Sequence, residues 1–249
     1  MGKPTCGAMT EQAAATMGVK VWVFLTEIVA ALGSVLSLVR GNFGWSLGFG
    51  TLLALAALIS RKLSLRNPEP IPYSLHWVLL LPRIADSPKH LRQLLELQSG
   101  EHVLEIGPGI GIHALAIAPA IMPGGTLNVL DVQKKMLDEL TRRATRAGIT
   151  NIIPIQGDAH NLPYPDNTFD AAYLIGVLGE IPERYRALRE LRRILKRNGR
   201  LVVGEVFFDP DFVPLVLLQE EARQAGFAFE RSIGPRLYYL ACFRLSPVF

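Results

Sequence analysis

The sequence predicts an α/β domain built on a mostly parallel sheet and preceded by an apolar helical hairpin. After residue 101, strand-like and helix-like patterns alternate, which is typical of parallel strands joined by crossover helices. Two apolar stretches with few charges lie within residues 19–60. Between these parts, the alternating prolines of residues 67–72 (NPEPIP) favour an extended chain and exclude a continuous helix. We therefore expect an anchor (1–66), a linker (67–72) and a domain (73–249).

Charge is distributed unevenly along the 249 residues, which are 49% hydrophobic and 19% charged with a formal net charge of +4. Residues 1–66 hold six basic and two acidic residues, whereas residues 67–249 hold 20 of each. Basic residues beside apolar helices suit an anionic membrane surface, and the neutral remainder argues against a nucleic-acid partner. Cys6 and Cys242 lack metal-ligand spacing, so we expect no disulfide framework and no metal site.

The apolar stretches predict helices over about 19–39 and 42–60. A bilayer core needs about 20 apolar residues as helix, and 42–60 carries no charge. The first helix contains Glu27, which must lie near an interface or face the second helix. A short polar turn at 40–42 makes the pair antiparallel. Basic residues flank both ends, so we expect membrane association, lipid contact through 19–66 and a cytoplasmic catalytic domain.

Two other interpretations of the hairpin stay open. A cleaved signal peptide is disfavoured, because the first apolar run begins near residue 19 and a second run follows it. The helices could also lie in the membrane interface, or pack against a second copy of the chain as a homodimer.

The domain's elements follow in order. An apolar segment (73–81) would lie on the membrane or cover a pocket, and a helix capped by Ser87 would begin at Pro88. At the end of the domain, two strand-like segments are joined by a turn with no helix between them, which predicts an antiparallel hairpin. The expected strands are 102–106, 126–131, 152–156, 169–174, 200–207, 227–233 and 237–245, and the expected helices are 111–121, 133–147, 183–196 and 214–225.

The first of these strands runs into a glycine-rich turn. Glu105 is followed by Gly107, Gly109 and Gly111, which allow positive φ or close approach of a ligand to the backbone. The second strand ends at Asp131, where a carboxylate can accept both ribose hydroxyls of an adenosine, and Asp158 follows the third strand. Since ligands bind at the carboxyl ends of parallel strands, we expect a nucleotide-like ligand at this edge.

Five motifs succeed one another along the predicted sheet. They are Glu105–Gly111 (EIGPGIG), Asp131, Gly157-Asp158-Ala159, Phe169–Tyr173 (FDAAY) and Leu195–Leu201 (LKRNGRL). In this order they resemble class I S-adenosylmethionine-dependent methyltransferases, closest to the ubiquinone/menaquinone C-methyltransferase and small-molecule branch. The likeness covers about residues 85–245 and implies a Rossmann-like fold with a seven-stranded, mostly parallel sheet and an antiparallel C-terminal hairpin.

The resemblance implies a cofactor, S-adenosyl-L-methionine, with S-adenosyl-L-homocysteine as the product, and roles for individual residues. The glycine loop with Pro108 would pass under the methionine moiety, oriented by Glu105. Asp131 would bind the ribose hydroxyls beside Val132. Asp158 and Ala159 would bind the adenine, while Ile175 and Gly176 would face the methyl-transfer site. Simpler structural roles compete, since Glu105 could cap the turn and Asp158 could be a turn residue.

Methyl transfer from a sulfonium needs mainly alignment, and a general base only for certain acceptors. Spacing does not select among the candidate bases Glu180, His160, Tyr164, Tyr73 and His76. The sequence thus predicts a membrane-anchored methyltransferase acting on a lipophilic small molecule, such as a quinone precursor or lipid headgroup. A non-catalytic membrane scaffold and a nicotinamide-dependent oxidoreductase remain alternatives.

Overall fold

The computed structural model describes residues 26–27, 29–66, 68–80, 88–207 and 209–246. By internal contacts the chain forms two compact units, Met1–Pro68 and Glu69–Phe249. The expected tail, the first third (19–25) of the helix expected over 19–39 and the Ser87 cap lie outside the described residues.

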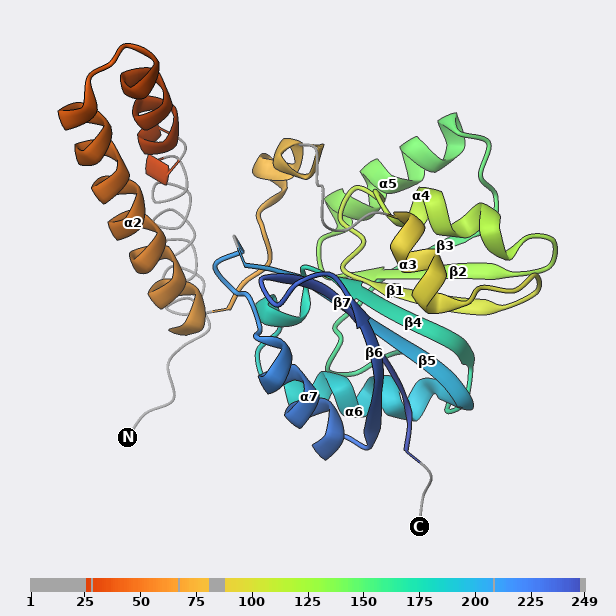
Figure 1. Ribbon diagram of the computed structural model, residues 1–249. Helices are drawn as coiled ribbons and strands as arrows, with labels where there is room; N and C mark the ends of the chain where they lie inside the picture. Colours follow the sequence, from red (N-terminus) through yellow and green to blue (C-terminus); the bar gives the residue numbers. More distant parts are fainter. Residues whose placement is uncertain (1–25, 28, 67, 81–87, 208, 247–249) are drawn as a thin grey trace, which may run out of the picture. The chain divides into compact units, whose positions relative to one another are not determined.

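The first unit holds two antiparallel helices, Val29–Val39 and α2 (Phe43–Arg66), joined by a turn in which Gly41 takes a φ of +70° (Figure 1). They approach closely, because a Cβ added to Gly33 would lie 2.8 Å from the Phe49 ring. The Glu27 carboxylate accepts a hydrogen bond from Ser60 on α2. Glu27 therefore faces the second helix, one of the two placements that its charge allowed.

The helix α2 extends six residues beyond the expected end at residue 60, because no glycine or proline interrupts it before Pro68. Its segment Phe43–Ser64 is, among the described residues, the one helix long and apolar enough to cross a membrane by length and composition; Val29–Val39 is shorter.

The second unit is built on one seven-stranded sheet with the order β3-β2-β1-β4-β5-β7-β6. The first five strands pair in parallel, and β7 lies antiparallel between β5 and β6. The strands are β1 (His102–Ile106), β2 (Thr126–Asp131), β3 (Ile152–Gln156), β4 (Phe169–Ile175), β5 (Leu195–Val206), β6 (Phe227–Ile233) and β7 (Tyr238–Leu245). This is the expected Rossmann-like sheet with an antiparallel C-terminal hairpin.

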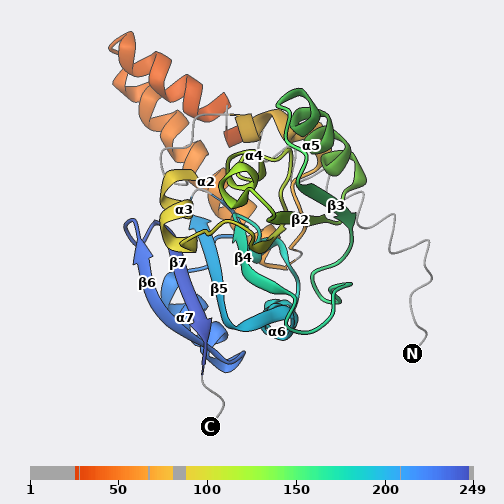
Figure 2. The same cartoon turned by 90° about the vertical axis from the view of Figure 1, so that its right-hand side faces the viewer.

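Helices cover both faces of this sheet (Figures 1 and 2). The helices α3 (Pro88–Leu95), α4 (Ala114–Ile117) and α5 (Lys134–Arg146) pack on one face, and α6 (Arg184–Ile194) and α7 (Leu215–Gln224) pack on the other. Strands β1 and β4 are buried on both sides, as is usual for the centre of a parallel sheet. The two cores thus hold the carboxyl ends of β1, β2 and β4 rigidly side by side.

Several boundaries differ from expectation for local reasons. The helix expected over 111–121 is shortened to α4 and continues as the 3-10 helix Ala118–Ile121, because Pro119 lacks the amide hydrogen for α-helical bonding. Strand β5 begins at Leu195 rather than 200, because Leu195 pairs with Phe169 across a bulge; α6 accordingly ends at Ile194. The apolar segment expected at 73–81 forms a 3-10 helix, Tyr73–Leu80.

Candidate functional site

The glycine loop follows β1 and adopts a backbone that only glycine takes without strain. Gly107, Gly109 and Gly111 have φ values of +65°, +52° and +84°. A Cβ on Gly107 would lie 2.5 Å from Cγ2 of Val177, and one on Gly111 would lie 2.8 Å from Cγ of Leu140. The loop is therefore fixed between Val177, two residues after β4, and helix α5.

Glu105 lies beneath this loop with 2% of its surface exposed. The hydroxyl of Tyr173 on β4 donates a 2.8 Å hydrogen bond to its Oε2. Burial raises the pKa of Glu105 to about 8; the hydrogen bond from Tyr173 opposes this rise, and the nearby charge of Asp131 adds to it. Because this pKa lies close to neutral pH, a cation placed beside the carboxyl group would shift it towards the ionised form.

Asp131, the last residue of β2, is 7% exposed and is tied to the loop. Its carboxylate accepts backbone hydrogen bonds from Gln133, at 2.8 Å, and also from Gly109 and Val132. Burial raises its pKa despite these three donors. Val132 beside it is 48% exposed and offers an apolar surface. The second strand thus delivers a carboxylate to the side of the glycine loop.

Asp158 follows β3 at the same edge, and its side chain is 63% exposed. Its Oδ1 accepts from the backbone N–H of His160 at 2.9 Å and lies 2.6 Å from Nδ1 of that ring. Partial burial would raise the pKa of Asp158, but the hydrogen bonds from His160 outweigh it and lower the pKa. Ala159 beside it is buried. Asp158 therefore holds a turn here, the simpler of its two expected roles, while its exposure leaves it accessible.

The end of β4 completes the edge. Ile175 is buried, and Gly176 has a φ of +64° with its N–H donated to the Gly204 carbonyl. A Cβ on Gly176 would lie 3.7 Å from Oδ2 of Asp209. Removal from water and then repulsion by Asp209 and Asp211 raise the pKa of half-buried Glu180 well above its usual value. Acidic groups therefore surround the place where the methyl-transfer site is expected.

The structure places the candidate bases in different parts of the domain. Glu180 lies at this edge, and His160 lies beside it, with Nε2 bonded to the Pro182 carbonyl and Nδ1 to Asp158. Tyr73 and His76 stack on each other at 4.7 Å in the 3-10 helix. Tyr164 packs against Phe169, the first residue of β4, at the opposite end of that strand from Gly176. The structure does not bring Tyr164 to the edge.

A clamp at Ile71 is the feature that the sequence did not reveal. Its carbonyl accepts from Nε2 of Gln133 at 2.8 Å, and its N–H donates to Oε1 of Glu180 at 3.4 Å. Further along, Leu79 would lie 2.9 Å from a Cβ on Gly109. The segment from Ile71 to Leu79 thus covers the glycine loop. These contacts join residues 62 and 109 positions apart, and no local pattern encodes such a distance.

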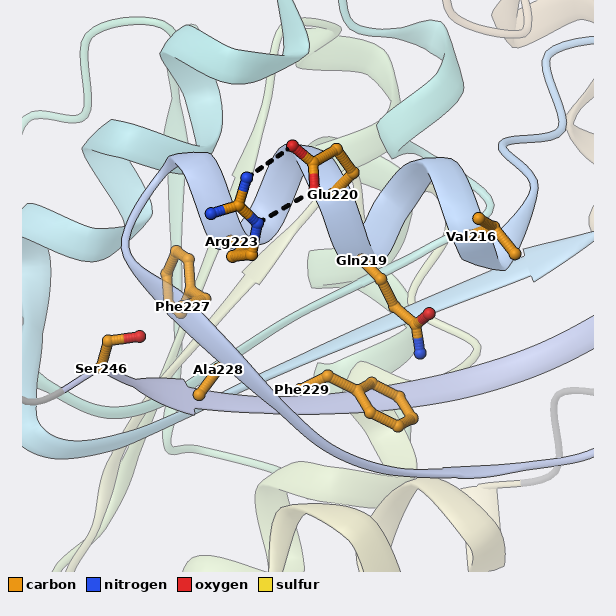
Figure 3. Close-up of a pocket in the computed structure, with 8 residues that line it drawn as sticks. All are labelled: Val216, Gln219, Glu220, Arg223, Phe227, Ala228, Phe229 and Ser246. Atoms are coloured by element: carbon orange, nitrogen blue, oxygen red, sulfur yellow. Dashed lines mark hydrogen bonds and ion pairs between the residues drawn. The ribbon is translucent and has the colours of Figure 1, made fainter.

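A concavity lies at the far edge of the sheet, between α7 and β6 (Figure 3). Exposed Phe229 and the ion pair of Glu220 with Arg223 line it. It contains no expected site residue.

Comparison with known proteins shows what the domain is similar to. Residues 104–203 match the family model of a methyltransferase domain. The chain is 30% identical over 139 residues to 27-O-demethylrifamycin SV methyltransferase of Amycolatopsis mediterranei (strain S699), covering 55% of this chain and 50% of that protein. It is 34% identical over 113 residues to demethylmenaquinone methyltransferase of Listeria monocytogenes serotype 4a (strain HCC23), covering 45% and 48%. The chain spans about half the length of these relatives.

Solved structures share the fold. An S-adenosylmethionine-dependent methyltransferase from Aquifex aeolicus superposes with a TM-score of 0.64 at 20% identity, covering 70% of this chain and 98% of that one. The [4+2]-cyclase SpnF superposes with a TM-score of 0.58 at 21% identity, covering 64% and 79%. Identities this low establish the fold alone, and a fold does not fix the reaction.

The family model covers the loop after β1, the acid at the end of β2 and the strand β4, which are the elements that form the site's edge. The sheet order and the motif order agree with that match. Over residues 104–203 the chain is thus similar to methyltransferase domains, and the domain shares its fold with S-adenosylmethionine-dependent methyltransferases of known structure.

Proposed function

We propose that the chain is a membrane-anchored methyltransferase that transfers a methyl group from S-adenosyl-L-methionine to a lipophilic small molecule, such as a quinone precursor or a lipid headgroup. One observation carries the cofactor assignment: the bare glycine loop is bordered by the buried carboxyl groups of Glu105 and Asp131. Glycines are needed because the loop has positive φ values and because a Cβ would collide with Val177, Leu79 or Leu140.

Charge distinguishes this cofactor from a nicotinamide dinucleotide. S-adenosylmethionine carries a cationic sulfonium and an amino group, whereas a dinucleotide carries an anionic pyrophosphate. A cation at this edge favours the ionised form of Glu105, Asp131 and Glu180, whose pKa values burial raises, whereas a pyrophosphate opposes their ionisation. The helix after the loop, α4, has only four residues and offers a weak dipole to phosphates. These features argue against the oxidoreductase alternative.

The chain's residues would divide the work as follows. Asp131 holds the ribose hydroxyls, with Val132 against the adenine, and Glu105 orients the loop or the amino group. Asp158 and Ala159 border the adenine end, and Ile175 and Gly176 border the reacting end. Bound S-adenosylmethionine supplies an activated methyl group, so the protein mainly aligns acceptor and donor. Glu180 is the candidate base with the best position, because it lies at this edge and faces Asp209 and Asp211.

The anchor supports the substrate class. Chain length alone places Ile71, which contacts the site, within about 18 Å of Arg66 at the end of α2, because each residue spans at most about 3.6 Å. If α2 crosses the bilayer, the site is near the membrane surface on the cytoplasmic side. The relatives that methylate demethylmenaquinone by name make a quinone precursor a reasonable candidate.

The proposal is tested by calorimetric titration of the full chain with S-adenosylhomocysteine and with NADH. We expect saturable binding of the first and none of the second, and at least a tenfold loss of binding in Asp131→Ala, since ribose hydrogen bonds to a charged group are worth about 1.5–3 kcal/mol. Absence of S-adenosylhomocysteine binding would overturn the assignment.

The non-catalytic scaffold is a second candidate, because this fold does not fix methyl transfer, as the name of the [4+2]-cyclase SpnF illustrates. Incubation of the enzyme and labelled cofactor with a lipid extract distinguishes the two, since only a methyltransferase moves the label into lipid. Deletion of residues 1–66 tests the anchor: the remaining protein should need no detergent, whereas retention in membranes would refute the assignment.

A further inference from the structure

The 3-10 helix Tyr73–Leu80 presents an apolar surface that the described part of the domain leaves uncovered. It contains no buried side chain and no Lys, Arg, Asp or Glu. Trp77 and Leu80 are 42% and 57% exposed. An aromatic and an aliphatic side chain on one uncharged turn form an apolar patch that water solvates poorly.

The same segment is held against the site on its other side. Ile71 is bonded to Gln133 and Glu180, and Leu79 lies on the glycine loop at Gly109. Gln133 in turn donates its backbone N–H to Asp131. One side of the segment therefore belongs to the candidate cofactor site, while Trp77 and Leu80 stay outside it.

Chain length says what lies near that outer side. Six residues, 67–72, separate α2 from the 3-10 helix. Seven steps of at most about 3.6 Å keep Tyr73 within about 25 Å of Arg66. The positively charged end of α2, with Arg61, Lys62 and Arg66, is where the helix would leave the bilayer into an anionic headgroup layer. The nearest large apolar phase is then the bilayer itself.

We propose that Tyr73–Leu80 is a membrane-inserted lip of the methyl-transfer site, in which Trp77 and Leu80 dip into the membrane interface and guide a lipophilic acceptor towards Gly176. Trp is enriched in this interface because its ring is apolar and its N–H is polar. The proposal rests on the proposed membrane-anchored methyltransferase. It adds the surface through which the acceptor would leave the lipid.

Fluorescence quenching by brominated lipid tests the lip directly. The full chain with Trp22→Phe and Trp45→Phe keeps Trp77 as its one tryptophan. It is placed in nanodiscs of phosphatidylcholine and phosphatidylglycerol, with and without bromine on the acyl chains. We expect about a twofold fall in emission in brominated discs, as for a ring at the boundary of headgroups and acyl chains.

Two matched variants serve as controls for this measurement. Phe229→Trp, in a chain lacking the three native tryptophans, reports on a site of almost equal exposure, 41%, at the far edge of the sheet. It should stay unquenched. A chain that keeps only Trp45 reports on α2 and should be quenched.

Each pattern of quenching supports or overturns the proposal. Quenching of Trp77 and Trp45 without quenching at 229 supports the lip. Quenching of Trp45 alone overturns it and leaves the anchor standing, as would be expected if a second copy of the chain covered Trp77. Equal quenching at 77 and 229 also overturns it, because lipid contact would be unspecific. Titration with S-adenosylhomocysteine in the same discs tests the cofactor assignment separately.

Discussion

Tyr173 donates a 2.8 Å hydrogen bond to Glu105 between two neighbouring strands, and both side chains are buried. This bond opposes the large rise that burial imposes on the pKa of Glu105. Tyr173 is therefore placed to control the charge of the acid beneath the glycine loop without touching the loop itself.

Tyr173→Phe should raise the pKa of Glu105 above about 8, because it removes the hydrogen bond that favours the carboxylate. A cationic ligand binds the ionised form best, so affinity for S-adenosylhomocysteine, which keeps the amino group, should rise with pH through that pKa. In the variant the midpoint of this rise should move to higher pH in calorimetric titrations. In Glu105→Gln the rise should vanish, and an unchanged midpoint in Tyr173→Phe would refute this role.

Gly107→Ala should destabilise the domain by about 2–4 kcal/mol, from a φ of +65° and a contact of 2.5 Å with Val177. Gly148→Ala is the matched control, since Gly148 has a φ of +68° but no atom within 4 Å of the added Cβ. It should cost only about 1–2 kcal/mol. Denaturant unfolding measures both, and equal losses would show that Val177 adds nothing.

Stability should fall as pH rises from about 5 to 8. Burial raises the pKa of Glu205 to about 8, and repulsion by Asp209 adds to the rise. The folded state therefore keeps a proton that the unfolded chain loses near its usual value of 4.5. This contribution is complete below the unfolded pKa and is lost as pH rises through the folded one.

Glu205→Gln removes this titration, so the decline of the unfolding free energy should become shallower by about 1.4 kcal/mol per pH unit. Unfolding in denaturant at several pH values measures the slope. Glu220→Gln is the control, because Glu220 is exposed and its hydrogen bonds lower its pKa to about 2. It should leave the slope between pH 5 and 8 unchanged, and equal slopes for Glu205→Gln and the wild type would contradict the prediction.

Gln133→Ala should loosen the cover of the site, because the side chain of Gln133 binds the Ile71 carbonyl while its backbone, which the substitution keeps, binds Asp131. We expect faster proteolysis within residues 70–80 and faster release of S-adenosylhomocysteine. Gln156→Ala is the control: its exposed side chain binds the Val132 carbonyl instead. Equal proteolysis of the two variants would contradict a clamp at Ile71.

Much of the fold could be predicted from the sequence because its signals are local. The alternation of strand-like and helix-like segments predicted β1, β2, β3 and β6 with the bounds that the structure has. Predicted boundaries were wrong where a contact with a residue distant in the sequence sets them. Leu195, for example, pairs with Phe169, and β5 therefore begins earlier than expected. Pro119 ended α4 sooner than the apolar pattern indicated, although that signal was present in the sequence.

The candidate site divides in the same way. The glycine spacing and the acids at strand ends mark residues that share one sheet edge, since parallel topology brings strand ends together. Their roles in binding stay predictions. Tyr173 and Gln133 could not be identified as partners of Glu105 and Ile71, because each pairing depends on the register between strands or on a linker folding back, and a single sequence shows neither.

Strand β7 lies between β5 and β6, although it is the last strand to be synthesised. The sheet therefore cannot close until residues 238–245 have left the ribosome, whereas the apolar helices emerge some 170 residues earlier. If the apolar helices enter a membrane, as proposed, their insertion can begin while the sheet is still incomplete. The order of the elements along the chain would then separate membrane insertion from folding of the sheet in time.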